Sequence, residues 1–336
     1  MRFRKSTRLK VLLCILLIVS AAVIFDRYND TQNTQDVEFI IQDGMSLKKV
    51  SAVLNENGII RSSMYLRLTA RLYDMDASMQ SGRFVIAPKT SMRKLLQKFR
   101  QPDQRYNEFT IPEGYTFYQI ASKLEESGII SKEAFIDLSV NIMKDAIDNT
   151  ERRDVYYSPE GFLFPDTYFI PEGFSEEKIF KMLYGRFQEI FLQEYEKRAE
   201  ALGLSKNEII TIASLIEKEA ANDEERKRIA GVIYNRLERE MPLQIDATVI
   251  YGITRGERTM NQVTYEDLKV DSLYNTYLYK GLPPGPIASP GKASIEAALY
   301  PEKHDYLYYV LNEGGHVFSK TYSEHMTNVE KYRKNR

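Results

Sequence analysis

One segment of this chain occurs twice, and this repeat restricts the fold more than any other feature of the sequence. Residues 44–60 align without a gap on residues 114–130, and six of the seventeen aligned pairs are identical. Each copy has the pattern of a strand, a turn, a helix begun by Ser46 or Thr116, and a glycine that ends the helix. A partial third copy at residues 84–99 repeats the strand and the helix. The sequence therefore predicts small α+β units in series.

The N-terminus places a basic stretch before an apolar one. Five Lys or Arg residues lie within residues 1–10, and residues 11–25 carry no charge. Because basic residues stay on the cytoplasmic side, we expect residues 1–10 to form a cytoplasmic tail and residues 11–25 a single-pass membrane anchor. Residues 26–36 are a polar tether, and the rest of the chain is extracytoplasmic in this interpretation. A cleaved signal peptide is the alternative, because residues 19–21 suit a cleavage site.

The charged and sulfur-containing residues exclude several classes of function. Lys plus Arg (46) nearly equal Asp plus Glu (47), so no net charge attracts a nucleic acid. The single cysteine, Cys14, excludes internal disulfides and thiolate metal clusters. The three histidines lack the spacing of a zinc-binding helix, so a metal hydrolase is not expected. Acid–base chemistry in this chain therefore depends on carboxylates.

Residues 205–221 form a predicted helix that carries an acidic residue on its apolar face. Ser205 and Glu208 have capping-box spacing at its start. Glu219 lies three and four positions after Ile216 and Leu215, so its carboxyl group shares the apolar stripe. Such a carboxyl is costly to ionise, its pKa rises, and it can act as a general acid. In the alternative, the helix ends near Lys218 and both Glu217 and Glu219 face water.

Residues 243–252 alternate polar and apolar at their start and predict a strand or an extended wall of a cleft. Gln244, Asp246 and Thr248 would then share one face of the strand and offer polar groups to a ligand. A plain solvent-exposed face explains the pattern equally well. Asp246 matters in particular, because a second carboxylate near Glu219 would define two-carboxylate glycoside chemistry.

Other segments are predicted from local signals. Residues 159–168 form an ordered aromatic loop, whose rings fill the core, and residues 281–291 form a stiff loop with four prolines and three glycines. The remaining predicted elements are helices at 175–202 and 223–239 and a hairpin at 306–318. Asn235 and Arg236 lie beside the apolar stripe of the second of these helices.

Taken together, several segments resemble the MltG/YceG-like family of membrane-anchored endolytic murein transglycosylases. The resemblance runs from the N-terminal segment to about His325, and its blocks follow the family order. The blocks are 160–168 (EGFLFPDTY), 213–219 (ASLIEKE), 235–237 (NRL), 243–246 (LQID) with 248–252 (TVIYG), 274–277 (YNTY), 281–285 (GLPPG) and 314–316 (GGH).

The resemblance implies an organisation. It implies an α+β protein with an N-terminal transmembrane helix, LysM-like strand–helix modules and a mixed catalytic domain with a lysozyme-like cleft. The expected boundaries are 37–105 for a LysM-like domain and 106–336 for the catalytic domain, which includes a second LysM-like repeat near residues 109–130. Beside a membrane anchor, such repeats suggest modules that bind the cell wall or act as spacers, although they are also plain packing units.

The resemblance also implies a reaction. The catalytic acid of the family falls on Glu219, the residue that the helical pattern selects. It would cleave the MurNAc–GlcNAc β-1,4 bond of nascent glycan strands and leave 1,6-anhydro-MurNAc ends, which would terminate glycan elongation. No cofactor or metal is implied. Candidates for contacts to the glycan are Gln244, Asp246, Tyr251, Asn275 and Tyr277. Expected partners are peptidoglycan strands and peptidoglycan synthases, and not nucleic acid.

Two other classes of function fit the same residues. A hydrolytic muramidase would use Glu219 together with a second carboxylate, for which Asp246 is the first candidate. A non-catalytic scaffold that binds the cell wall would account for the anchor and the repeats without any reactive glutamate.

Overall fold

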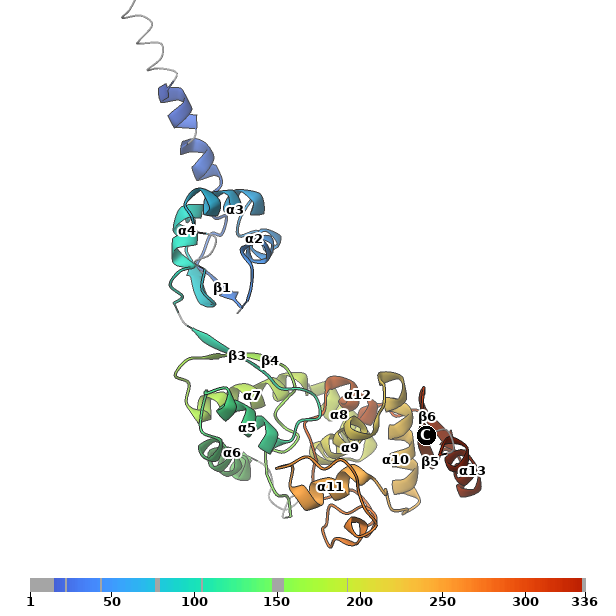
Figure 1. Cartoon of the computed structure of the whole chain (residues 1–336). Helices are drawn as coiled ribbons and strands as arrows, with labels where there is room; N and C mark the ends of the chain where they lie inside the picture. Colours follow the sequence, from blue (N-terminus) through green and yellow to red (C-terminus); the bar gives the residue numbers. More distant parts are fainter. Residues whose placement is uncertain are drawn as a thin grey trace, which may run out of the picture. The chain divides into compact units, whose positions relative to one another are not determined.

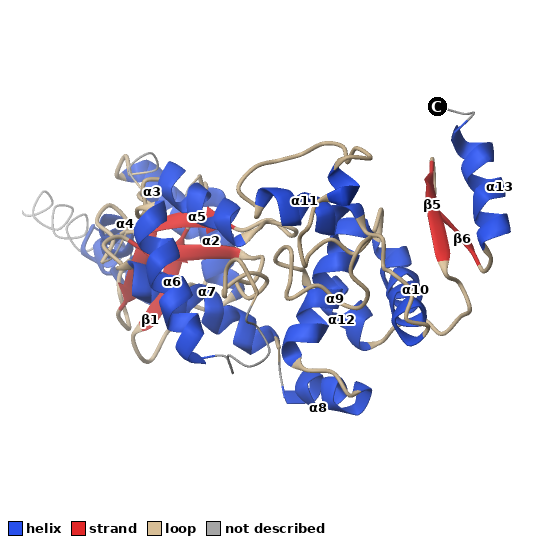
Figure 2. Cartoon of the chain, turned by 90° about the horizontal axis from the view of Figure 1, so that it is seen from below, coloured by secondary structure: helices blue, strands red, loops and turns tan. Residues whose placement is uncertain are grey.

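The structure of the chain is a computed structural model that describes residues 15–21, 23–42, 44–75, 79–103, 105–146, 154–191 and 193–333. It divides into two compact units. Unit 1 is Met1–Glu108 with Phe169–Gly173, and unit 2 is Phe109–Tyr168 with Phe174–Arg336. Helices and strands are mixed along the chain (Figure 2), which confirms the predicted α+β class.

Unit 1 is built around one antiparallel pair of strands. Its elements are β1 (Val37–Ile41), α2 (Leu47–Glu56), α3 (Ser63–Leu72), β2 (Gly82–Ile86) and α4 (Met92–Lys98) (Figure 1). β1 pairs with β2, and Phe39 lies opposite Phe84 in the register. Both rings contact Phe99, which follows α4. The two strands and three helices thus share one apolar core.

Two further strands, β3 (Tyr106–Thr110) and β4 (Thr167–Pro171), form a two-stranded sheet of their own. The helices of unit 2 are α5 (Phe117–Glu126), α6 (Lys132–Ala146), α7 (Glu176–Ile190), α8 (Gln193–Leu202), α9 (Lys206–Glu219), α10 (Arg226–Glu238), α11 (Asp246–Thr254), α12 (Lys292–Leu299) and α13 (Tyr322–Arg333), with 3₁₀ turns at Asp223–Glu225 and Asp267–Lys269. The remaining strands, β5 (Tyr308–Asn312) and β6 (Gly315–Ser319), form the predicted antiparallel hairpin.

The internal repeat is confirmed in the backbone of both copies. Ser46 caps α2 and Thr116 caps α5, in each case through a side-chain oxygen that accepts an N–H of the first turn. Gly58 and Gly128 follow the helices with φ of +68° and +67°, a conformation that favours glycine. In each copy a second helix and a closing strand follow, so the repeated unit is strand–helix–helix–strand.

One predicted helix is wrong in its extent. Residues 175–202 form two helices, because α7 ends at Ile190 and α8 begins at Gln193. Phe191 leaves the helical conformation, with ψ of 69°, and its ring packs against Phe187 and Tyr195. No glycine or proline marks this break, so the local sequence gave no signal for it.

The predicted membrane anchor, residues 11–25, lies only partly within the described residues. The described portion is helical at residues 15–21 and 23–28. Within the described part of the chain, no helix combines the length and the apolar character that crossing a membrane requires. Cys14 lies outside the described residues.

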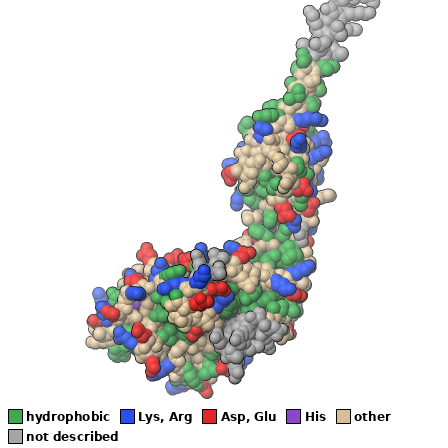
Figure 3. All heavy atoms as spheres, turned by 180° about the vertical axis from the view of Figure 1, so that it is seen from behind, with side chains coloured by type: hydrophobic (Ala, Val, Ile, Leu, Met, Phe, Trp, Pro, Cys, Tyr) green, Lys and Arg blue, Asp and Glu red, His purple; other side chains and the backbone are tan. Residues whose placement is uncertain are grey.

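Helix α9 is central to unit 2, because it packs against α10, α11 and α12. The β5–β6 hairpin packs against α13, next to α10 in the views of Figures 1 and 2. On the face shown in Figure 3, acidic and basic side chains are interspersed, in keeping with a formal net charge of −1.

Candidate active site

Helix α9 begins as its sequence predicts. The Ser205 side chain accepts the backbone N–H of Glu208, and the Glu208 carboxylate accepts the backbone N–H of Ser205, which completes the capping box. Every residue from Ile209 to Ile216 is buried, so the helix runs through the interior of unit 2. Ala220 is extended and ends the helix directly after Glu219. Glu219 therefore lies at the point where a buried helix ends.

Glu219 is half-buried, and its carboxyl group accepts one short hydrogen bond. The hydroxyl of Tyr309 in β5 donates to its Oε2 at 2.7 Å. Burial is the largest effect on this group and raises its pKa, and the negative charge of Asp246 adds to the increase. The Tyr309 bond and the charges of His316 and Arg236 lower the pKa only in part. A carboxyl with a raised pKa keeps its proton closer to neutral pH, as a general acid requires.

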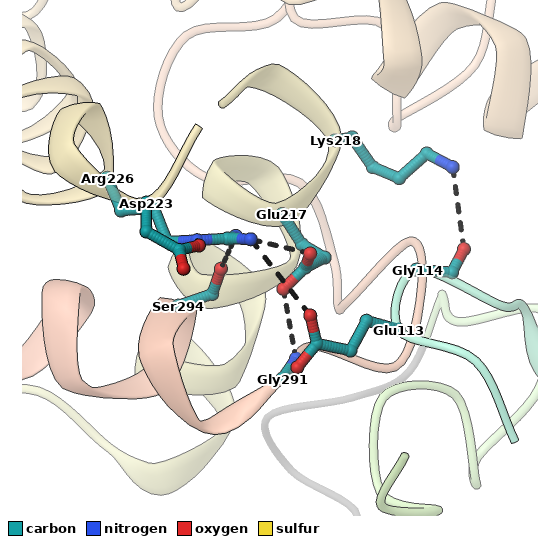
Figure 4. Close-up of polar contacts among 8 residues, drawn as sticks. All are labelled: Glu113, Gly114, Glu217, Lys218, Asp223, Arg226, Gly291 and Ser294. Carbon is teal, nitrogen blue, oxygen red and sulfur yellow. Dashed lines mark hydrogen bonds and ion pairs between the residues drawn. The ribbon is translucent and has the colours of Figure 1, made fainter. Parts of the chain in front are cut away.

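Glu217, two residues earlier, has a different environment (Figure 4). Its side chain is 7% exposed and pairs with the guanidinium of Arg226 in α10 at 3.1 Å. Its second carboxylate oxygen accepts the backbone N–H of Gly291 at 3.0 Å. Arg226 is also bonded to Asp223 and Ser294. Glu217 is thus paired with a permanent cation, and the alternative in which both glutamates face water is wrong.

The predicted strand at residues 243–252 is wrong, because residues 246–254 form helix α11. Gln244, the second residue of the predicted strand, has φ of +52°, a left-handed conformation that is incompatible with a strand. The helix then begins at Asp246, whose negative charge is favourable in a first turn, and buries Val249 and Tyr251. Burial of one helical face therefore outweighs the weak helix propensity of its β-branched residues.

Glu219 and Asp246 line one pocket of about 380 Å³ in unit 2. The second copy of the repeat contributes to the wall of this pocket through Thr116 and Gln119. Thr116 donates its hydroxyl to the carbonyl of Gly256 at 2.9 Å, which fixes the start of α5 beside the loop after α11. The pocket thus combines two carboxyl groups with the helix start of a repeat unit.

The second carboxylate also has a tyrosine partner. The hydroxyl of Tyr277 donates to Oδ1 of Asp246 at 2.6 Å. Burial raises the pKa of Tyr277 above its usual value, and the hydrogen bond to Asp246 raises it further, so the phenol remains a donor at neutral pH. Each of the two carboxyl groups in the pocket is therefore held by one phenolic hydroxyl.

The other predicted contact residues are in different environments. Tyr251 lines the pocket, but its hydroxyl donates to the buried carboxylate of Glu160 at 2.8 Å. Asn275 is fully buried, and its amide donates to the carbonyls of Leu268 and Val270, so it stabilises a loop. Gln244 is exposed and does not line the pocket. The structure thus brings together Glu219, Asp246, Tyr251 and Tyr277.

Two loops that the sequence singled out pack around α9. Phe162, Leu163 and Phe164 of the aromatic loop are buried, which confirms that they fill the core. In the proline-rich loop, the backbone N–H of Ile287 donates to the hydroxyl of Ser214 in α9 at 3.1 Å. Ile287 also lines the pocket, so this loop forms part of its wall.

Sequence reasoning missed Tyr309, although it predicted the strand on which this residue lies. Tyr309 is 90 residues from Glu219, and nothing in the local pattern of β5 indicates which helix the strand approaches. The Gly-Gly turn that follows was the only signal, because it fixes the hairpin and thus the direction of the strand.

The chain is similar in sequence and in fold to known proteins. Residues 39–331 match the sequence profile of the YceG-like family. The chain is 32% identical over 335 residues to the endolytic murein transglycosylase of Bacillus subtilis (strain 168), which covers 94% of this chain and 91% of that protein. It is 30% identical over 331 residues to the endolytic murein transglycosylase of Streptococcus pneumoniae serotype 2 (strain D39), covering 90% of this chain but 59% of that longer protein. A 2.6 Å crystal structure of a yceG-like protein from Listeria monocytogenes aligns with a TM-score of 0.63 and 31% identity, covering 88% of this chain and 99% of that chain.

Proposed function

Because this chain belongs to the YceG-like family, we propose that it is an endolytic murein transglycosylase, the activity after which its relatives are named. The observation in the structure that carries the proposal is the carboxyl group of Glu219. It lies in a pocket, it is half-buried at the end of α9, and its pKa is raised. These are the properties of a group that arrives protonated at a glycosidic oxygen.

In the proposed reaction, Glu219 acts twice. It first donates its proton to the oxygen of the MurNAc–GlcNAc bond, so that the C1–O bond breaks and GlcNAc leaves with a hydroxyl group. The resulting carboxylate then removes the proton of the C6 hydroxyl of the same muramyl residue as its oxygen bonds to C1. The product is 1,6-anhydro-MurNAc, no water is consumed, and Glu219 ends the cycle protonated.

The residues around Glu219 suit this cycle. Tyr309 donates to the oxygen Oε2, which leaves Oε1 for proton transfer to the substrate. Asp246 supports the protonated form through its negative charge, and Arg236 supports the carboxylate formed after the first step. The two opposing effects keep Glu219 able both to release and to recover a proton.

A hydrolytic muramidase remains a second candidate, because Asp246 lines the same pocket as Glu219. In that mechanism the aspartate would activate water or attack C1, and the product would have a reducing end. The bond between Tyr277 and Asp246 occupies one carboxylate oxygen and leaves the other for such a role.

Mass spectrometry of the products decides between these reactions. The 336-residue chain is incubated with uncrosslinked peptidoglycan beside a folded Glu219→Gln variant. We expect anhydro-muramyl ends from the wild type and an unchanged polymer from the variant. Reducing ends would select the hydrolase. An intact polymer that remains bound to the wild-type chain would select the scaffold.

The cellular setting is also a proposal. The apolar side chains at the described N-terminal positions are exposed, among them Ile18 at 68% and Ile24 at 69%, and lipid would cover them if residues 11–25 anchor the chain. The catalytic unit would then lie outside the cell membrane. In that position the enzyme would work beside peptidoglycan synthases and terminate glycan elongation. Crosslinking in intact cells that repeatedly recovered no synthase would contradict this partnership.

We also propose that the strand–helix units are LysM-like modules, and that unit 1 binds glycan for the catalytic pocket. The repeated strand–helix–helix–strand order supports this assignment. A pull-down with insoluble peptidoglycan measures the binding. Full binding by variants of unit 1 would contradict the proposal that this unit binds glycan.

A further inference from the structure

Helix α10 carries a buried arginine whose hydrogen bonds to two separate backbone segments have no part in the proton transfers described above. Arg236 is 9% exposed, and its guanidinium donates to two backbone carbonyls at short distance. Nε donates to the oxygen of Leu307 at 2.7 Å, and Nη1 donates to that of Leu243 at 2.6 Å. A longer contact of 3.4 Å joins Nη1 to the carbonyl of Pro242.

Arg236 has no carboxylate partner among the described residues, since no ion pair within 4.0 Å involves it. Arg226, on the same helix, differs in this respect, because it pairs with Glu217 and Asp223. A buried charge without a counter-charge destabilises a fold unless its hydrogen bonds compensate for lost hydration. For Arg236 the compensation comes from neutral carbonyls and from the ring of Tyr308, whose centroid lies 5.3 Å from Cζ. A buried charge in such an environment is a candidate for a functional role.

The two carbonyls belong to residues that lie shortly before β5 and α11, the elements that carry Tyr309 and Asp246. Leu307 precedes β5, which carries the Tyr309 hydroxyl to Glu219. Leu243 lies three residues before Asp246, the first residue of α11. One guanidinium group therefore joins α10 to both segments that supply the neighbours of Glu219.

Several charged or titratable groups act on Glu219 from the surrounding elements. Tyr309 of β5 donates the hydrogen bond, Asp246 of α11 contributes a negative charge, and His316 of β6 lies behind Tyr309. His316 is already paired with the carboxylate of Glu225 at 2.8 Å. Lys218 and Arg258 also line the pocket. Among the groups that lower the pKa of Glu219, Arg236 is the one whose positive charge is permanent.

We propose that Arg236 is a positioning residue for the transglycosylase reaction. Its guanidinium holds the segments that carry Tyr309 and Asp246 against Glu219, and its charge stabilises the carboxylate that Glu219 becomes between the two proton transfers. This inference rests on the proposed function, because Glu219 requires a nearby positive charge only if it becomes a carboxylate during the reaction.

The test compares charge with hydrogen bonding at one position. Arg236→Gln and Arg236→Met remove the charge, and Arg236→Lys retains it. Asn235→Ala is the matched control, because Asn235 is neutral and its amide donates to the carbonyls of His304 and Tyr306 in the same segment. For each variant, anhydro-muramyl ends per folded molecule are measured as a function of pH.

We expect the neutral variants to lose about 10- to 100-fold in turnover. The decline of their activity at high pH should move upward by about one unit, because Glu219 holds its proton more tightly without the cation. Arg236→Lys should keep the wild-type position of that decline, and Asn235→Ala should lower stability without moving it. The proposal would be overturned if both neutral variants folded and their activity fell at the same high pH as that of the wild type. It would also be overturned if the activity of Arg236→Lys fell at the shifted pH of the neutral variants. A wild-type chain that yields no anhydro ends would instead contradict the proposed function.

Discussion

The hydroxyl of Tyr309 donates a 2.7 Å hydrogen bond to Oε2 of Glu219 across 90 residues of sequence. This bond fixes one oxygen of the carboxyl group and stabilises its ionised form, and burial of the same group favours the protonated form. In the proposed mechanism, the balance between these two effects sets the pH range of the activity.

Tyr309→Phe removes the hydrogen bond and keeps the ring. Because a hydrogen bond to a charged group contributes about 1.5 to 3 kcal/mol, turnover should fall roughly 10- to 100-fold. The pKa of Glu219 should rise, so the decline of activity at high pH should move upward. Tyr265→Phe, at a position 84% exposed, is the control and should match the wild type. Wild-type turnover and pH profile in Tyr309→Phe would show that the bond has no role in the reaction.

Glu219→Gln should change the pH dependence of stability. The folded pKa of Glu219 lies above its unfolded value, so its contribution to stability is complete below the unfolded pKa and is lost as pH rises through the folded pKa. The glutamine variant lacks this loss. Thermal unfolding should therefore show similar Tm values for variant and wild type near pH 4, and a higher Tm for the variant near pH 8. A variant less stable than the wild type at pH 8 would contradict the raised pKa.

Glu217→Gln should reduce stability and not chemistry. The substitution leaves the guanidinium of Arg226 without its buried carboxylate partner and only with the exposed Asp223, and breaking a buried pair costs about 3 to 5 kcal/mol. Calorimetry should show a clearly lower Tm, and the surviving folded molecules should keep the pH profile of the wild type. Glu177→Gln, which breaks an exposed pair with Lys181, is the control and should leave Tm unchanged. Equal Tm values for the two variants would contradict the structural role of Glu217.

Two helical glycines should respond oppositely to alanine. A Cβ at Gly231 in α10 would overlap the carbonyl oxygen of Glu302 and the ring of His304, so Gly231→Ala should destabilise by about 1 to 3 kcal/mol. A Cβ at Gly185 in α7 meets no atom within 4 Å, so Gly185→Ala should stabilise by up to about 1 kcal/mol. Denaturant unfolding measures both changes. Stabilisation of both variants would show that α10 does not pack against residues 302–304 as described.

Local chemistry explains what could be predicted from the sequence. Ser46, Thr116 and Ser205 each start a helix, because the side chain of each accepts a backbone N–H three residues later. Glycines follow α2 and α5 and end these helices. Glu219 could be selected because an acidic residue on an apolar stripe is visible within one helix. These signals act over a few residues and need no knowledge of the fold.

The features that could not be predicted depend on distant parts of the chain. Helix α11 looked like a strand, because a short polar–apolar alternation is ambiguous until burial of Val249 and Tyr251 selects one face. Tyr309 and Arg236 could not be assigned to Glu219, because their contacts join separate elements. Asn275 looked like a ligand-binding residue until the structure showed two backbone carbonyls as its partners.

The position of the β5–β6 hairpin late in the chain has a consequence for synthesis. A ribosome completes α9, which ends at Glu219, 90 residues before Tyr309 is added. A nascent or prematurely terminated chain that ends before β5 therefore contains the whole Glu-Lys-Glu block but lacks the phenol that orients it and the carbonyl that Arg236 binds. In the proposed mechanism, such an incomplete chain would have much lower activity than the chain in which β5 and β6 have folded.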